Sequence, residues 1–117
     1  MFNALLKAYK INPDNPEIYV NFVTYYEMKG NSAKRKEFNE KLYYANQISP
    51  GLLAYGYNVL MSMKPGSILL TFCDNDTYPL WLLQDVFNIR TDVVVFNTLL
   101  VLEPEYGKAI FRKMNMP

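Results

Sequence analysis

Hydrophobic positions in the first half of the chain recur at helical spacing. Gly30 and three proline-containing segments separate the periodic stretches, because proline and glycine are typical of helix boundaries. Apolar residues three and four positions apart predict helices over residues 2–11, from Pro16 to Gly30, from Ser32 to about Ile48, and from Leu52 to about Met63. The first half is therefore expected to be entirely helical.

After Pro65 and Gly66 the pattern changes to two short, almost continuous apolar runs. Residues 67–73 and 92–97 are bounded by turn signals, as expected of strands buried on both faces of a sheet. Between them, a polar turn leads to a helix expected to start at Pro79, and a last helix is expected from Pro104 through Met114. A strand, a helix and a strand in this order predict a βαβ unit with parallel strands.

A repeated motif gives the helical half a family resemblance. Ile11-Asn12-Pro13 recurs as Ile48-Ser49-Pro50, and each copy precedes an aromatic-rich helix ending in Met-Lys. A repeat period in the thirties is typical of stacked helix pairs. The stretch from Ala4 to Glu17 and the helix that follows it resemble a degenerate tetratricopeptide repeat over roughly residues 3–63. This resemblance implies TPR-like antiparallel helix pairs that bind a protein or peptide.

Many tyrosines occur in the helical half, and most are expected in the repeat core. Aromatic side chains are also favoured anchors at interfaces. The candidate peptide-binding residues are Tyr19, Tyr26 and Tyr55.

The second half carries a more specific resemblance. Gly66 to Phe72, the stretch Asp74 to Trp81, and Ile89 to Val93 follow one another in a distinctive order. They resemble a soluble portion of bacterial protein O-mannosyltransferase-like membrane proteins, over about residues 52–115. The chain departs from that pattern at Phe72-Cys73, where small polar residues are usual. The resemblance implies an accessory domain, and it transfers no catalytic residue to this chain.

Together these patterns predict an α+β or α/β protein. We expect a TPR-like helical segment over residues 1–64 and a small parallel βαβ unit, a Rossmann-like half, over residues 65–117. Because two parallel strands make a thin sheet, this half is expected to be completed by self-association into a homo-oligomer or by a longer chain.

The polar turn after the first strand is the best candidate site. In open parallel sheets, ligands bind beyond the carboxyl ends of the strands. The candidate ligand-binding residues are Asp74, Asn75, Asp76, Thr77 and Trp81.

Several interpretations of this turn stay open. Its carboxylates and amide are suited to a sugar or nucleotide beside Trp81 or Tyr78, and they are also suitable ligands for Mg²⁺ or Ca²⁺. The spacing of Asp74 and Asp76 is similar to the catalytic pair of haloacid-dehalogenase-like phosphotransferases, although Tyr78 stands where that family has threonine or valine. The simplest alternative is that the turn only caps a helix.

Composition excludes much chemistry. The chain has no histidine, which removes the commonest general base and metal ligand, and its single Cys73 rules out an intramolecular disulfide. A net charge of +1 predicts no nucleic-acid partner, and Lys34-Arg35-Lys36 is interpreted as a solvated helix face. No apolar run is long enough for a membrane span.

We therefore expect a soluble, non-enzymatic assembly module without a cofactor, located in either the cytoplasm or the periplasm. The alternative is an accessory carbohydrate- or nucleotide-handling domain linked to cell-envelope glycosylation.

Overall fold

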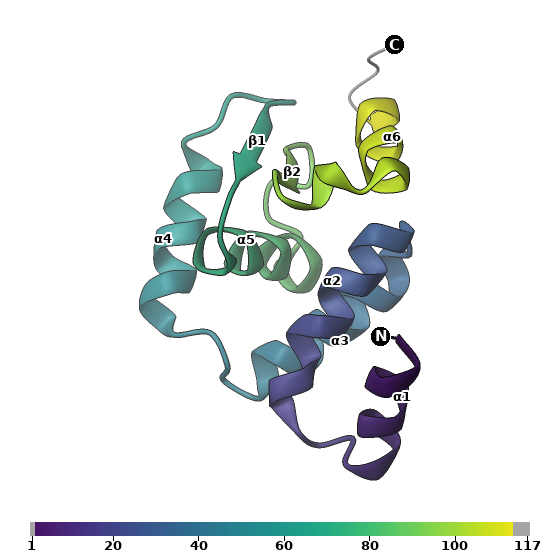
Figure 1. Ribbon diagram of the computed structural model, residues 1–117. Coiled ribbons are helices and arrows are strands. Elements are labelled where there is room, and N and C mark those ends of the chain that lie inside the picture. The colour runs from purple at the N-terminus through teal and green to yellow at the C-terminus, as the bar shows by residue number, and fades with distance from the viewer. Residues whose placement is uncertain (1, 114–117) are drawn as a thin grey trace.

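The computed structural model describes residues 2–113, which form helices and one small parallel sheet (Figure 1). The elements are α1 (Phe2–Ile11), the 3-10 turn η1 (Pro16–Ile18), α2 (Tyr19–Lys29), α3 (Ser32–Tyr44), α4 (Pro50–Met61), β1 (Ile68–Thr71), α5 (Asp74–Phe87), β2 (Val94–Asn97), the 3-10 turn η2 (Leu100–Leu102) and α6 (Pro104–Lys113). The α+β class is confirmed, whereas the TPR-like pairing and the Rossmann-like half stay predictions. Met114, in the predicted last helix, lies outside the described residues.

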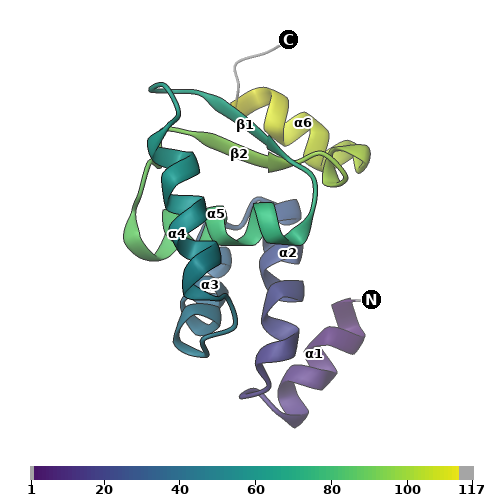
Figure 2. The same ribbon diagram turned by 90° about the vertical axis from the view of Figure 1, so that its left-hand side faces the viewer.

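Aromatic rings hold the first three helices together. Phe22 of α2 stacks on Phe38 of α3 with ring centroids 4.3 Å apart, and Tyr9 of α1 meets both rings edge-on. Gly30 ends α2 in the left-handed conformation, at a φ of 70°, which glycine adopts without steric cost. The tight turn brings α3 back alongside α2 (Figure 2).

The third predicted helix was expected to reach Ile48, but α3 ends at Tyr44. Asn46 has a φ of 55°, and this left-handed residue turns the chain out of the helix. Ser49 then caps α4 by accepting a hydrogen bond from the Leu52 N–H at 3.2 Å.

The sheet consists of β1 and β2, which run parallel, with Ile68 opposite Val94 and Thr71 opposite Asn97. The helices α4 and α5 lie on one side of this sheet and α6 lies on the other (Figures 1 and 2). Accordingly, Val95 of β2 joins the core formed with α5, whereas the next residue, Phe96, packs against α6.

The helix between the strands begins earlier than the sequence predicts. It starts at Asp74, so Pro79 lies inside α5 and does not open it. The Asp76 carboxylate accepts hydrogen bonds from the N–H groups of Phe72 and Cys73, at 3.1 and 2.7 Å, and thereby caps the helix at its true start. The predicted polar turn is thus the first turn of α5.

The prediction that both strands are buried on both faces is wrong for β1. Ile68 and Leu70 point to the side occupied by α6, yet they are 45% and 57% exposed. The reason is that α6 packs on Phe96 of β2 and leaves the neighbouring strand uncovered on that side.

One continuous hydrophobic core joins the two halves of the sequence. It includes Phe22 and Leu42 of the first three helices together with Leu80 and Trp81 of α5. Among the described residues, no helix has the length and apolar character needed to cross a membrane.

Candidate functional site

A cavity of about 510 Å³ lies at the carboxyl ends of both strands, where α5 begins. Its polar wall is formed by Thr24, Asp74, Asn75, Thr77, Tyr78 and Asn97. Its apolar wall includes Phe72, Trp81, Leu99 and Leu100. The cavity therefore occupies the position at which open parallel sheets bind their ligands.

Two of the predicted acidic-turn residues are available to a ligand. Asp74 and Asn75 form the exposed start of α5 and line the cavity. The N-terminal end of a helix favours negative charge, which stabilises the Asp74 carboxylate there. Asp76 differs, because its carboxylate oxygens are engaged by the Phe72 and Cys73 N–H groups. The structure thus separates a capping aspartate from one that faces the cavity.

Thr77 is buried and joins the ends of both strands to α5. Its hydroxyl lies 2.6 Å from the Thr71 hydroxyl and 2.7 Å from the Cys73 carbonyl oxygen, and it accepts a hydrogen bond from Asn97 Nδ2 at 3.1 Å. Asn97 Oδ1 accepts from the Leu99 N–H at 2.8 Å. This network fixes the floor of the cavity.

Asn97 is a site residue that the sequence interpretation missed. The available signal was a polar amide at the end of an otherwise apolar strand, which is the position expected for a residue at the carboxyl edge of the sheet.

Tyr78 connects the cavity to the helical half of the protein. Its hydroxyl is hydrogen-bonded to the Thr24 hydroxyl of α2. Burial raises the pKa of Tyr78, the hydrogen bond with Thr24 lowers it, and the charge of Asp74 raises it, with a net upward shift. Tyr78 is therefore a neutral phenol at physiological pH.

Trp81 lines the cavity but is almost entirely buried, with 1% of its surface exposed. Its Nε1–H donates to the Val95 carbonyl oxygen at 3.1 Å. The indole therefore shapes the cavity, and its hydrogen-bond donor is already used by the sheet.

The three candidate peptide-binding tyrosines lie in different surroundings. Tyr19 is 6% exposed and donates its hydroxyl hydrogen to the Pro13 carbonyl, so its ring belongs to the core. Tyr26 is half-buried. Tyr55 is 63% exposed on α4 and lines a separate cavity of about 170 Å³ beside β1. Of the three, Tyr55 offers the most open ring.

A buried ionic network lies next to Trp81, where the Arg35 guanidinium carbon is 5.5 Å from the centre of the indole ring. The Arg35 guanidinium of α3 donates to both carboxylate oxygens of Asp85 on α5 and to Glu27 on α2. Asn39 donates to Asp85 at 2.6 Å, and the Tyr106 hydroxyl donates to Glu27 at 2.7 Å. Four helices are thereby joined through polar side chains.

The interpretation of Lys34-Arg35-Lys36 as a solvated face is wrong for Arg35, whose side chain is only 12% exposed. Burial alone lowers the pKa of Arg35, but the hydrogen bonds and charges of Asp85 and Glu27 outweigh it and raise that pKa. No sequence signal pairs Arg35 with a carboxylate fifty positions away.

Among residues 2–113, no group of three or more histidine, cysteine or acidic side chains is arranged to hold a metal ion. The interpretation as a haloacid-dehalogenase-like pair needs two available aspartates. The carboxylate of Asp74 faces the cavity, whereas that of Asp76 is engaged in helix capping.

The fold and the cavity define a small α+β domain with a polar site at the carboxyl edge of a parallel sheet. The chain belongs to the family described as TMEM260-associated domain 2, whose family model matches residues 52–116. This segment begins within α4 and includes the sheet, α5 and most of the cavity wall. Neither a curated protein nor a solved structure matches the chain significantly.

Proposed function

We propose that this chain is a non-enzymatic accessory domain that binds a polyhydroxylated, sugar-type ligand in the cavity at the ends of β1 and β2. The observation that carries this proposal is the cavity of about 510 Å³ with polar groups on one wall and apolar groups on the other. Ligand sites of small molecules typically have this volume and this combination of surfaces.

The chemistry of the wall suits hydroxyl groups. The Asp74 carboxylate accepts hydrogen bonds, the Asn75 amide both donates and accepts, and the neutral Tyr78 phenol does the same. The side chain of Phe72, 59% exposed, supplies apolar surface beside these groups. A sugar presents the matching combination of hydroxyl groups and C–H faces.

The family match also favours a sugar-type ligand. TMEM260 is a protein O-mannosyltransferase, and residues 52–115 resemble part of protein O-mannosyltransferase-like membrane proteins. A domain that accompanies a mannosyltransferase would bind the sugar donor, the acceptor or the product of the transfer. The chemical class that fits this context is a mannose-containing glycan or a sugar nucleotide.

The test is a binding titration of the 117-residue chain with mannose, a mannose disaccharide and a nucleoside diphosphate sugar, followed by NMR or calorimetry. We expect at least one of these probes to bind and to shift signals from residues that line the cavity. The double variant Asp74→Ala, Asn75→Ala is expected to lose binding while its melting temperature falls only slightly, because both side chains are exposed.

The matched control is Asp14→Ala, which removes an exposed carboxylate from the connection between α1 and η1, outside the cavity wall. This variant is expected to bind as the unchanged protein does. Binding that survives the double substitution, or no binding to any of the three probes, would contradict the proposal.

A second candidate is a protein-assembly module, as the tetratricopeptide resemblance implies. The supporting observation is that large aromatic side chains remain exposed on the helices: Tyr44 of α3 is 76% exposed and Tyr55 of α4 is 63% exposed. An immobilised peptide library tests this candidate. Binding that is lost in Tyr55→Ala and retained in Tyr57→Ala would favour a peptide surface on α4 over non-specific adhesion.

A further inference from the structure

The strand β1 and the residue directly after it have an open apolar face, which we define as Ile68, Leu70 and Phe72 and call the β1 face. These side chains are 45%, 57% and 59% exposed. Within residues 2–113, β1 pairs only with β2, so its other edge has no partner strand in this part of the chain (Figure 1). The open face of β1 and its unpaired edge therefore adjoin one another.

The sequence of β1 lacks the features that normally protect an edge strand. Natural edge strands carry charged residues, proline or bulges that prevent pairing with another chain. Between Lys64 and Asp74 this chain has no charged side chain. The segment thus has the composition of an interior strand while it occupies an edge position.

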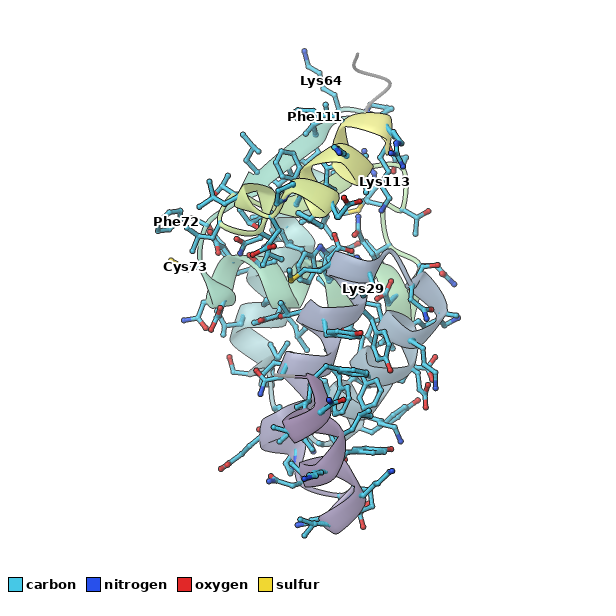
Figure 3. The ribbon with its side chains drawn as sticks, turned by 45° about the vertical axis from the view of Figure 1, so that its right-hand side comes forward. Lys29, Lys64, Phe72, Cys73, Phe111 and Lys113 are labelled. Atoms are coloured by element: carbon cyan, nitrogen blue, oxygen red, sulfur yellow. The ribbon has the colours of Figure 1, made fainter. Side chains whose placement is uncertain are left out.

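Charges stand at both ends of this strand, and they have opposite signs. Lys64 is exposed ahead of β1, and Asp74 is exposed directly after it, in the first turn of α5. Figure 3 shows Lys64 at one end of the strand and Phe72 with Cys73 at the other. An identical strand laid antiparallel along the edge would bring each lysine toward the acidic turn of the other copy.

We propose that β1 pairs antiparallel with β1 of a second copy of this chain, and that the two sheets join into one of order β2-β1-β1′-β2′. The pairing is isologous, so each contact occurs twice about a two-fold axis. This inference needs no ligand in the sugar cavity, although Phe72 and Asp74 also line that cavity.

The alternation of side chains restricts the register. Shifting a strand by one residue moves every side chain to the opposite face of the sheet. The open faces of the two copies therefore lie on the same side of the joined sheet in only every second register. The register with Leu70 opposite Leu70 also places the side chain of Ile68 opposite that of Phe72, so the side chains of the whole β1 face meet. The backbone N–H of Phe72 stays bonded to Asp76, and the backbone pairing is made within Ile68–Thr71. In this register Lys64 approaches the first turn of α5 in the second copy, where Asp74 and Asp76 lie.

Disulfide cross-linking tests directly whether Leu70 lies at the two-fold axis of the proposed dimer. In a Cys73→Ser background, Leu70→Cys places the only cysteine of each copy next to its symmetry mate, at a separation that antiparallel strands share with disulfides. Under mild oxidation we expect a covalent dimer. The matched control Leu102→Cys, at a residue that is 81% exposed outside the strand, is expected to remain largely monomeric.

Sedimentation of the unlinked chain supplies the second measurement. We expect a concentration-dependent dimer that Leu70→Lys abolishes and Leu102→Lys leaves intact. Lys64→Glu is expected to weaken the dimer several-fold, and adding Asp74→Lys to it should restore the affinity. A chain that stays monomeric at all concentrations, or equal cross-linking of the two cysteine variants, would overturn the proposal.

Discussion

Arg35 and Asp85 form a two-fold hydrogen-bonded ion pair between α3 and α5. Arg35 Nε lies 2.8 Å from Asp85 Oδ2, and Nη2 lies 2.7 Å from Oδ1. Each side chain is 12% exposed, so both charges are largely removed from water. The pair connects the predicted TPR-like segment to the helix that crosses between the strands, and it fixes the two parts against each other.

The first prediction concerns the loss of this pair. Arg35→Ala leaves Glu27 and Asp85 buried without their cation, and this is expected to lower the free energy of unfolding by about 3–5 kcal/mol. Urea denaturation measures the change. The control is Lys34→Ala, which breaks an exposed pair with Glu37 and is expected to change the free energy of unfolding far less than Arg35→Ala does. Equal losses in both variants would show that Arg35 is not the buried connector.

A second prediction separates the two aspartates at the start of α5. Asp76→Ala removes the acceptor for two backbone N–H groups and is expected to lower the free energy of unfolding by about 1 kcal/mol. Asp74→Ala removes only a favourable charge at the helix end, with an expected loss of a few tenths of a kcal/mol. Thermal or chemical denaturation distinguishes them. A larger effect at Asp74 would be inconsistent with the capping assignment.

The third prediction concerns the close approach of α4 to α5. A Cβ built on Gly56 would lie 3.3 Å from side-chain atoms of Leu80 and Leu83, so the two helices pack here without room for a large side chain. Gly56→Leu is expected to lower the free energy of unfolding by about 1–3 kcal/mol through overpacking. Gly51→Leu, in the same helix with open space around it, is expected to change it by less than about 0.5 kcal/mol. Similar melting temperatures for the two variants would contradict this packing.

Local signals in the sequence were sufficient for most of the fold. Pro16, Gly30 and Ser49 mark helix ends by their own backbone or hydrogen-bonding preferences, and the structure has helix boundaries near each of them. The start of α5 was missed because Pro79 resembles a first-turn proline, whereas the capping carboxylate of Asp76 acts through backbone groups that only the folded turn brings within reach.

The site was predictable only in part. The rule for parallel sheets places Asp74 and Asn75 at the carboxyl edge, and in the structure both line the cavity there, while their role in binding stays a prediction. Thr24 reaches the same cavity from α2, and nothing in its own neighbourhood along the chain indicates this. Asn97 differs, because a polar amide at the end of an apolar strand was a usable signal. The burial of Arg35 was not predictable either, because the sequence around a charged residue on a polar helix does not indicate which distant carboxylate it pairs with.

The last prediction concerns alkaline pH and the hydrogen bond from Tyr106 to Glu27. Burial, followed by the charge of Glu27, raises the pKa of Tyr106 well above its ordinary value of 10.0. The folded protein therefore keeps this phenol protonated at a pH where the unfolded chain begins to lose the proton. The stabilising effect is complete below the ordinary pKa and is lost as the pH rises above it.

Tyr106→Phe is accordingly expected to act in two ways. At neutral pH it lowers the free energy of unfolding by about 1–3 kcal/mol, because one buried Glu27 oxygen loses its donor. Above about pH 10 its stability is expected to fall less steeply than that of the unchanged protein, since the variant has no phenol to titrate at this position. Urea denaturation across this pH range measures both effects, with the half-exposed Tyr57→Phe as control. Parallel pH profiles for Tyr106→Phe and the unchanged protein would mean that Tyr106 titrates normally and that the buried hydrogen bond does not control its proton.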